Sequence, residues 1–347
     1  MKKILMKASS YYWEKAKGID LAERYEKGKL SFMLLNQPPL CDAHCRRCFM
    51  PKERRSLAKS SSALDLGEWK EIIRKGKEKG VLSLELSGEG EPLLSENTLP
   101  IIRYANSIGI ITTLITTGHA LNEGLTKALF EEGATLVFSL HSLDAEKYEK
   151  DNECPESYRI KMRAIETAAR IFTSSSYHEK GYLVQRLAIH ATLQADNLGE
   201  VEDLRRFCND RNMFFSIAPL ARTGNAVLHP ELHVDREITE VTSLGDNSII
   251  HSETSARIYG REVCGTAAFG MSIGFDGNLL PDAHGGYEIG HALGNVRIYG
   301  FDELFEIWRR MAGRMFRETE GFCPVRDEKR FSAFVSKLVK ENNVSSF

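Results

Sequence analysis

Six short, mostly apolar segments recur along the chain, and a segment with apolar residues at helical spacing follows most of them. The apolar segments cover residues 30–35, 81–86, 110–115, 135–140, 187–193 and 214–220. The first is a continuous apolar run, which is typical of a strand buried on both faces. Strands that alternate with helices predict a parallel sheet with right-handed crossovers. With polar residues after the strands, this pattern predicts an α/β fold, a partial (βα)6 TIM-like barrel over residues 29–225.

The expected helices carry their own start signals and apolar faces. Asp65 and Glu68 form a D-x-x-E capping signal before the first of them. Its apolar face comprises Leu66, Trp69, Ile72, Ile73 and Gly76. Further helices are expected at 96–108, 122–132, 157–173 (with Met162, Ile165, Ala169 and Phe172 inward) and after the capping residues Asn197 and Glu200.

Three cysteines follow the first predicted strand within eight residues. Cys41, Cys45 and Cys48 have the spacing C-x3-C-x2-C. Thiolates are soft ligands that suit zinc, copper(I) or iron–sulfur clusters. Three thiolates hold three irons of a [4Fe–4S] cluster and leave the fourth iron open, as at a catalytic rather than a structural metal site. The alternative is a zinc site in which His44 is the fourth ligand.

This spacing resembles the signature of the radical SAM superfamily, in which the open iron binds the amino and carboxylate groups of S-adenosylmethionine (SAM). The residue before the third cysteine is usually aromatic in that family. Here it is Arg47, and the aromatic residue follows as Phe49. The resemblance implies a [4Fe–4S] cluster on Cys41, Cys45 and Cys48.

A second motif follows the second strand, at Ser87-Gly-Glu-Gly-Glu-Pro92. It resembles the GEP element of the family, where a glutamate and nearby backbone hold the amino group of SAM. The resemblance implies that Glu91 binds this group and that Gly88 and Gly90 line the site, since small residues let a backbone approach a ligand. Ser139, at the end of the fourth strand, matches a polar residue that contacts SAM. His141 fits a structural or a functional role equally well.

Residues 261–347 resemble the twitch or SPASM extension of radical SAM enzymes, which carries auxiliary iron–sulfur clusters. A hairpin is predicted around the turn Asp276-Gly277-Asn278. A helix that begins at Asp302 and holds Leu304, Ile307, Trp308 and Met311 is expected after it.

The cysteines of this extension match the twitch pattern only in part. Cys264 and Cys323 stand where ligands are expected, whereas Asp282 and Arg326 replace the other two cysteines. Three interpretations are open. Asp282 completes a second cluster with Cys264 and Cys323, or the extension has lost its cluster, or Cys264 is a free thiol that donates a hydrogen atom to a substrate radical.

Length and composition narrow the class of protein. The 347 residues suit one large domain and a smaller one. We expect a helical lead-in at 1–28, the barrel at 29–225, a linker at 226–260 and the extension with a tail at 261–347. The net charge of −2 argues against a dedicated nucleic-acid or membrane surface.

Apolar segments and cysteine usage indicate the compartment. The amino-terminal apolar run, Ile4 to Met6, is too short for a signal-peptide core, and no segment is long enough to span a membrane, so a cytoplasmic location is expected. The odd count of 7 cysteines and their close spacing favour metal chemistry over disulfides.

The resemblance also implies an activity. The reduced cluster passes an electron to SAM, and the resulting 5′-deoxyadenosyl radical removes a hydrogen atom from the substrate. We expect an enzyme that acts on a small polar metabolite of the sugar, aminoglycoside or nucleoside type, by dehydrogenation, epimerisation or decarboxylation. An electron donor such as flavodoxin or ferredoxin is implied. The alternatives are a peptide-modifying radical SAM enzyme and a non-catalytic iron–sulfur redox protein, against which the SGEGEP motif counts.

Overall fold

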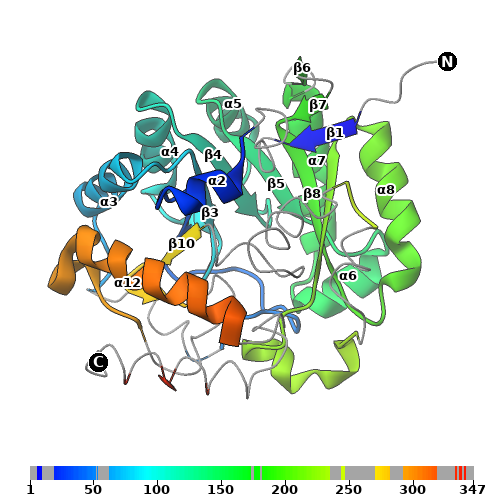
Figure 1. The fold of residues 1–347 in the computed structure, drawn as a ribbon. Helices are drawn as coiled ribbons and strands as arrows, with labels where there is room; N and C mark the ends of the chain where they lie inside the picture. The colour runs from blue at the N-terminus through cyan, green and yellow to red at the C-terminus, as the bar shows by residue number, and fades with distance from the viewer. Residues whose placement is uncertain are drawn as a thin grey trace.

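The structure is a computed structural model of the 347-residue chain. It describes residues 6–9, 19–51, 53, 62–172, 176–179, 182–234, 244–246, 270–281, 292–318, 333, 336, 337 and 340. Figure 1 shows a curved sheet whose outer side is covered by helices. Within the described ranges, no helix combines the length and apolarity needed to cross a membrane.

The main sheet has eight strands in the order β11-β10-β2-β3-β4-β5-β8-β9. All neighbours are parallel except the β10–β11 pair. The strands are β2 (Phe32–Asn36), β3 (Ser83–Ser87), β4 (Ile111–Thr116), β5 (Thr135–Ser139), β8 (Leu187–Leu193), β9 (Phe214–Pro219), β10 (Gly270–Ile273) and β11 (Leu279–Leu280). The first six of these are the six predicted strands, which confirms the α/β fold with a partial barrel.

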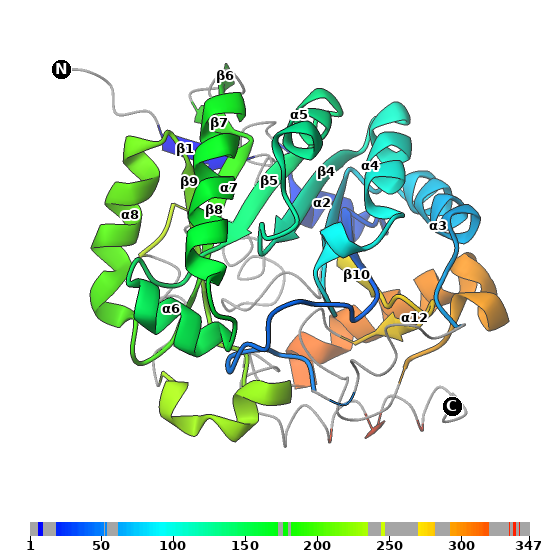
Figure 2. The same cartoon turned by 180° about the vertical axis from the view of Figure 1, so that it is seen from behind.

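Helices follow the strands as the sequence predicts. They are α2 (Leu21–Glu26), α3 (Leu66–Glu78), α4 (Thr98–Ser107), α5 (Glu123–Glu131), α6 (Ala145–Asn152), α7 (Ser157–Phe172), α8 (Val201–Asp210) and α12 (Val296–Glu318), with short 3-10 turns η3 (Pro92–Leu94), η5 (Leu198–Glu200), η6 (Gly224–Leu228) and η7 (Pro230–Leu232). The capping box before α3 is confirmed, because Asp65 Oδ1 accepts from Glu68 N at 2.9 Å and Asp65 N donates to Glu68 Oε2 at 2.8 Å. Figure 2 shows α7 lying over β8 on the outer side of the barrel.

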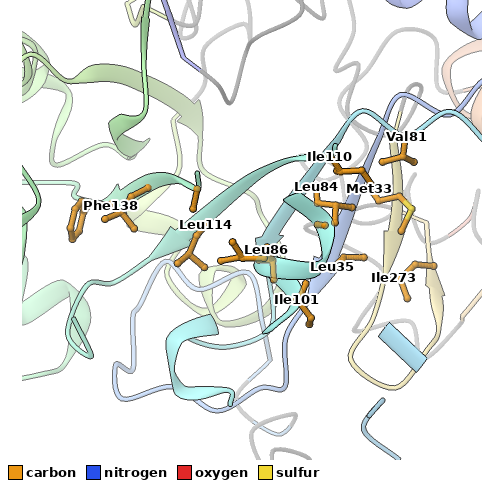
Figure 3. Close-up of a cluster of buried hydrophobic side chains, with 14 of the residues drawn as sticks. Met33, Leu35, Val81, Leu84, Leu86, Ile101, Ile110, Leu114, Phe138 and Ile273 are labelled. Atoms are coloured by element: carbon orange, nitrogen blue, oxygen red, sulfur yellow. The ribbon is translucent and has the colours of Figure 1, made fainter. Parts of the chain in front are cut away.

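The two faces of the sheet differ in chemistry. Because successive residues of a strand alternate between faces, Met33, Leu35, Leu84 and Leu86 point to the same side and pack with Ile101 of α4 in the apolar core (Figure 3). On the opposite, inner face, a cross-strand layer of Val137, Ala188 and Phe214 is apolar. The next inner layer toward the carboxyl ends is polar and consists of Ser139, His190 and Ser216.

The amino-terminal region differs from the predicted helical lead-in, because only α2 is helical among its described residues. A strand, β1 (Met6–Ser9), precedes α2 and runs parallel to β7 (Tyr182–Gln185). β7 also pairs with β6 (Tyr177–Glu179), which gives a separate three-stranded sheet. A four-residue strand is stabilised by a partner more than 170 residues away in the chain, and a local pattern does not reveal such pairing.

The hairpin and helix of the carboxyl-terminal region join the barrel directly. β10 runs parallel to β2 and extends the sheet, with β11 beyond it. The predicted turn is present, with Gly277 at φ +85°. On α12, Trp308 is 2% exposed and its Nε1 donates to Gly270 O at 2.6 Å. The predicted boundaries at 28, 225 and 260 remain predictions, and Cys264, Asp282, Cys323 and Arg326 lie outside the described residues.

Candidate functional site

The cysteine loop, residues 37–50, follows β2 at the carboxyl ends of the parallel strands. All three cysteines, Cys41, Cys45 and Cys48, are partly exposed. The loop does not stay beside its own strand. It contacts segments that follow four other strands, and these contacts hold the three thiols at the mouth of the barrel.

The first set of contacts joins the loop to the end of α6, after β5. His44 N donates to Asn152 O at 2.9 Å, and Arg46 N donates to Asp151 O at 2.9 Å. Cys45 Sγ donates to Asn152 Oδ1 at 3.1 Å. These contacts fix the middle of the loop, where the second cysteine lies.

The second set comes from the segment after β9, at the far edge of the sheet. Asn225 Nδ2 donates to Cys45 O at 2.8 Å, and Ala226 N donates to Cys48 O at 3.1 Å. Gly224 has φ +57°, and a Cβ there would lie 2.3 Å from Phe49 O. Because a side chain at Gly224 would displace the backbone at Phe49, the glycine lets the two segments pack closely.

The SGEGEP motif packs against the start of the cysteine loop. Gly88 has φ +106°, and a Cβ there would lie 2.0 Å from Asn36 Oδ1. A Cβ on Gly90 would lie 2.3 Å from Pro38 O and 2.5 Å from Leu40 O. The glycines therefore make room for the protein's own chain, and lining of a SAM site by Gly88 and Gly90 stays a prediction.

Glu91 is buried at 2% exposure beneath the loop. Its carboxylate accepts from Leu93 N at 3.0 Å, from Thr116 Oγ1 at 2.6 Å and from Thr117 N at 2.6 Å. Its main-chain N–H donates to Leu40 O at 2.8 Å. A carboxylate has about four acceptor positions, so three neutral donors leave capacity for an ammonium group.

Lys161 of α7 is a candidate site residue that sequence reasoning missed. It is 1% exposed, its Nζ donates to Ser139 O, and the ammonium lies 4.9 Å from the centroid of the Tyr148 ring. Burial lowers the pKa of Lys161 to about 7, with a further lowering from the nearby positive charge of Arg47. A buried ammonium beside the Ser139 strand end is a ready partner for an anionic group of a ligand.

A signal for Lys161 was present in the sequence. The inner stripe of α7 contains Lys161, Ala164, Ile165, Ala168 and Phe172, whereas Met162 and Ala169 pack only at its border. A lysine at helical spacing within an apolar stripe marks a buried charge, and buried charges are usually paired or functional.

His141 has the structural role that the sequence left open. It is buried, and its Nδ1 accepts from Thr192 N at 2.8 Å, which keeps the ring neutral. Burial is also the main reason that the pKa of His141 lies well below its usual range.

The prediction that Asn197 and Glu200 cap a helix was wrong. Neither side chain caps η5 or α8. Asn197 Nδ2 instead donates to His141 O and Thr192 O, both at 2.9 Å, while Glu200 Oε2 accepts from Ser142 Oγ at 2.6 Å. The buried loop after β5 offers these groups better partners than the helix end does.

The donors at the mouth fit a cluster. Burial, the largest cause, raises the pKa of Cys41 to about 12, with a smaller contribution from the charge on Cys45, so a thiolate there needs a metal to stabilise it. Among the described residues, no three His, Cys, Asp or Glu side chains converge as ligands of a single metal ion. In an iron–sulfur cube each cysteine binds a separate iron, so its ligands stand farther apart. Phe49, with Met50 and Leu280, packs beside Cys48.

Comparison with known proteins shows a family similarity over part of the chain. Residues 35–179 match the family model described as "Radical SAM superfamily". The chain is 28% identical over 185 residues to a probable GTP 3′,8-cyclase of Methanothermobacter thermautotrophicus, which covers 53% of this chain and 55% of that protein. It is 25% identical over 173 residues to a PqqA peptide cyclase of Rhizobium meliloti, which covers 50% of this chain and 42% of that protein. The chain thus spans about half the length of these relatives.

Solved structures show the same fold. SuiB of Streptococcus suis bound to its precursor peptide SuiA has a TM-score of 0.60 at 15% identity, over 88% of this chain and 71% of that one. SuiB bound to SAM has a TM-score of 0.58 at 18% identity, over 88% and 72%. The family match covers β2 to β6 and includes the cysteine loop, the SGEGEP motif and Lys161. Residues 35–179 of the chain are therefore similar to the radical SAM superfamily.

Proposed function

We propose that this protein uses a [4Fe–4S] cluster and SAM to remove a hydrogen atom from a polar substrate held inside the barrel. The observation that carries the proposal is the direct contact between the cysteine loop and the SGEGEP motif at the carboxyl ends of the strands. When bound, the cluster and SAM supply an organic radical by one-electron reduction. The protein's own residues bind and orient the cofactor and the substrate, and they exclude water from the site.

The residues of the mouth take separate roles in this proposal. Cys41, Cys45 and Cys48 hold three irons and leave the fourth for SAM. Glu91 receives the SAM ammonium, because its carboxylate retains acceptor capacity. Lys161, whose Nζ reaches the carbonyl of Ser139, receives the SAM carboxylate. Because Glu91 is negative and Lys161 is positive, the amino acid part of SAM can bind between them in one orientation only.

The polar residues on the inner face of the sheet favour a small polar metabolite as the substrate. Its layer nearest the mouth contains Ser139, His190 and Ser216, and His190 Nδ1 lies 3.0 Å from Ser216 Oγ. On the other side of the barrel, Ser87 Oγ donates to Glu85 Oε1 at 2.8 Å. Hydroxyl, imidazole and carboxylate groups recognise hydroxyl and amine groups through hydrogen bonds.

A peptide is the second candidate substrate. Several curated relatives are PqqA peptide cyclases, at 25–35% identity over a third to a half of this chain. A polar inner face also accepts a peptide side chain. In either case we place the protein in the cytoplasm, where thiols remain reduced, with a flavodoxin or ferredoxin as electron donor.

The test is anaerobic reconstitution followed by incubation with SAM, dithionite and either a metabolite mixture or candidate peptides. We expect 5′-deoxyadenosine by mass spectrometry, and deuterium transfer from labelled substrate identifies the substrate class. The triple variant C41A/C45A/C48A should form none and lose its iron. Stoichiometric zinc without iron in the wild-type protein would reject the proposal.

The extension needs a separate measurement, because its cysteines lie outside the described residues. We propose that Cys264, Asp282 and Cys323 hold a second cluster, with Cys264 as a hydrogen donor in the alternative case. About eight irons per chain indicate two cubes and about four indicate one. A count near four that is unchanged in Cys264→Ala removes the second cluster.

A further inference from the structure

Arg47 directly precedes Cys48, and its side chain is turned inward. It forms an ion pair with Asp151 in which the side chains are 8% and 6% exposed. Its Nη2 also donates to Asn152 Oδ1 at 2.7 Å. Asn152 is itself fixed, because its Nδ2 donates to Tyr148 O at 2.8 Å. The guanidinium is thus held by two consecutive residues at the end of α6.

The ion pair lies beside a cluster-binding sulfur. Asn152 Oδ1 accepts from Cys45 Sγ at 3.1 Å as well as from Arg47. The guanidinium and the sulfur therefore share one acceptor atom. Although burial acts in the opposite direction, the adjacent carboxylate of Asp151 raises the pKa of Arg47 above its ordinary value, so the guanidinium is charged.

We propose that Arg47 and Asp151 are positioning residues whose opposed charges set the reduction potential of the cluster on the cysteine loop. This inference rests on the proposed cluster. Reduction adds an electron, so a nearby positive charge stabilises the reduced form and raises the potential, while a carboxylate lowers it. Net charge and hydrogen bonds at the sulfurs are the features by which a protein sets such potentials.

Holding the cysteine loop against α6 does not by itself explain the buried ion pair of Arg47 and Asp151. Two main-chain hydrogen bonds, from His44 N and Arg46 N, already join the loop to α6. Burying two charges carries a desolvation cost that an apolar pair of similar size avoids. In a site of low dielectric the same charges act strongly on their neighbours. The neighbour here is the sulfur of Cys45, which shares the acceptor Asn152 Oδ1 with Arg47.

The two partners predict opposite effects on the midpoint potential, which a purely structural role does not. R47Q leaves Asp151 unpaired beside the cluster, so the potential should fall. D151N leaves Arg47 unpaired, so the potential should rise. The double variant R47Q/D151N should return toward the wild-type value, and R47K should stay near it. A tenfold change in the reduction equilibrium corresponds to about 59 mV for a one-electron couple.

The measurement is EPR-monitored potentiometry on reconstituted full-length protein, with iron content determined for each variant. R74Q is the matched control, because Arg74 is 45% exposed, pairs with Glu71 and Glu78, and its removal should leave the potential unchanged. Equal potentials, or shifts of one sign in both R47Q and D151N, would overturn the inference. If R47Q loses its iron, the potentials of D151N and R47K still show the direction in which the charge of Asp151 shifts the midpoint potential. A wild-type protein that binds no iron contradicts the proposed function instead.

Discussion

At the scale of single residues, the carboxylate of Glu91 combines an observed structural role with a proposed ligand-binding one. It accepts three hydrogen bonds, of which the two from Thr116 Oγ1 and Thr117 N join the SGEGEP motif to the end of β4. The same carboxylate is our candidate for the SAM ammonium. The two contributions of Glu91 can be separated by a substitution that removes its charge, because the three protein donors are neutral whereas the SAM ammonium is charged.

We expect Glu91→Gln to weaken SAM binding tenfold or more while the cluster is retained. A charge-assisted hydrogen bond contributes about 1.5–3 kcal/mol, and about 1.4 kcal/mol corresponds to a factor of ten. The dissociation constant of SAM, measured by calorimetry, checks this. Thr116→Val is the control, since it removes one donor to Glu91 and keeps the charge. It should lower stability and leave SAM affinity nearly unchanged, and equal loss of affinity in both variants would contradict the assignment.

Lys161 gives a prediction of how the stability of the folded protein depends on pH. Its pKa falls from an ordinary value near 10.5 to about 7 in the folded protein, chiefly through burial. Between these two values the unfolded chain binds more protons than the folded one, so stability rises with pH. Below pH 7 both states are protonated, and the full cost of burying the ammonium is present.

The free energy of unfolding of the metal-free wild type, relative to Lys161→Met, should therefore increase between pH 7 and pH 9. The upper limit is about 1.4 kcal/mol per pH unit, the value for one proton. Urea denaturation at three pH values measures it, and the difference between the proteins cancels groups that both share. Parallel stability profiles would show that Lys161 remains charged in the folded protein.

At the scale of elements, the mouth of the barrel is built from loops that support one another. The cysteine loop contacts the segments after β3, β4, β5 and β9, the β4 contact being His119 Nδ1 to Asp42 Oδ2 at 2.9 Å. The closest approach is at Gly90, where the backbone of Pro38 and Leu40 fills the space of a side chain. Because those atoms are backbone, they cannot swing away as a flexible side chain would.

Gly90→Ala should therefore displace the cysteine loop. We expect a loss of stability of about 1–3 kcal/mol, as for overpacking of a well-packed site, and a lower iron content, because Leu40 precedes Cys41. Gly199→Ala is the control, since a Cβ on Gly199 meets nothing within 4 Å. Iron analysis and urea denaturation compare the two variants. An iron content equal to that of Gly199→Ala would show that the loop accommodates the methyl group.

At the scale of the whole molecule, the hairpin from the carboxyl-terminal region is part of the barrel sheet. β10 extends the sheet beyond β2, and α12 holds β10 through Trp308. An unpaired β2 would present an open strand edge, which invites association. We therefore expect the barrel and this region to unfold as one unit.

Trp308→Ala tests this coupling. Large-to-small substitution of a buried tryptophan costs about 3–5 kcal/mol, and the loss should appear equally in far-UV circular dichroism and in the fluorescence of the two remaining tryptophans, Trp13 and Trp69. Trp308→Phe keeps most of the volume and loses the donor to Gly270, so its cost should be nearer 1 kcal/mol. Separate transitions by the two probes would mean that the barrel and the hairpin fold independently.

The elements themselves follow from short-range patterns. The six strands, the capping box at Asp65, the turn at Gly277 and the cysteine spacing depend on residues a few positions apart, and all can be read from the chain. The match of residues 35–179 to the radical SAM superfamily is likewise obtained from the sequence alone.

The assembled site depends on residues that are far apart in sequence. Arg47 meets Asp151, Lys161 reaches Ser139, and Asn225 holds Cys45 only after the sheet has curved and brought its strand ends together. The pairing of β1 with β7 and of β10 with β2 is decided in the same way. Hydrophobic periodicity selects helix or strand within one segment, whereas the partner of a buried charge or of a strand edge is selected by closure of the barrel, which no single segment encodes.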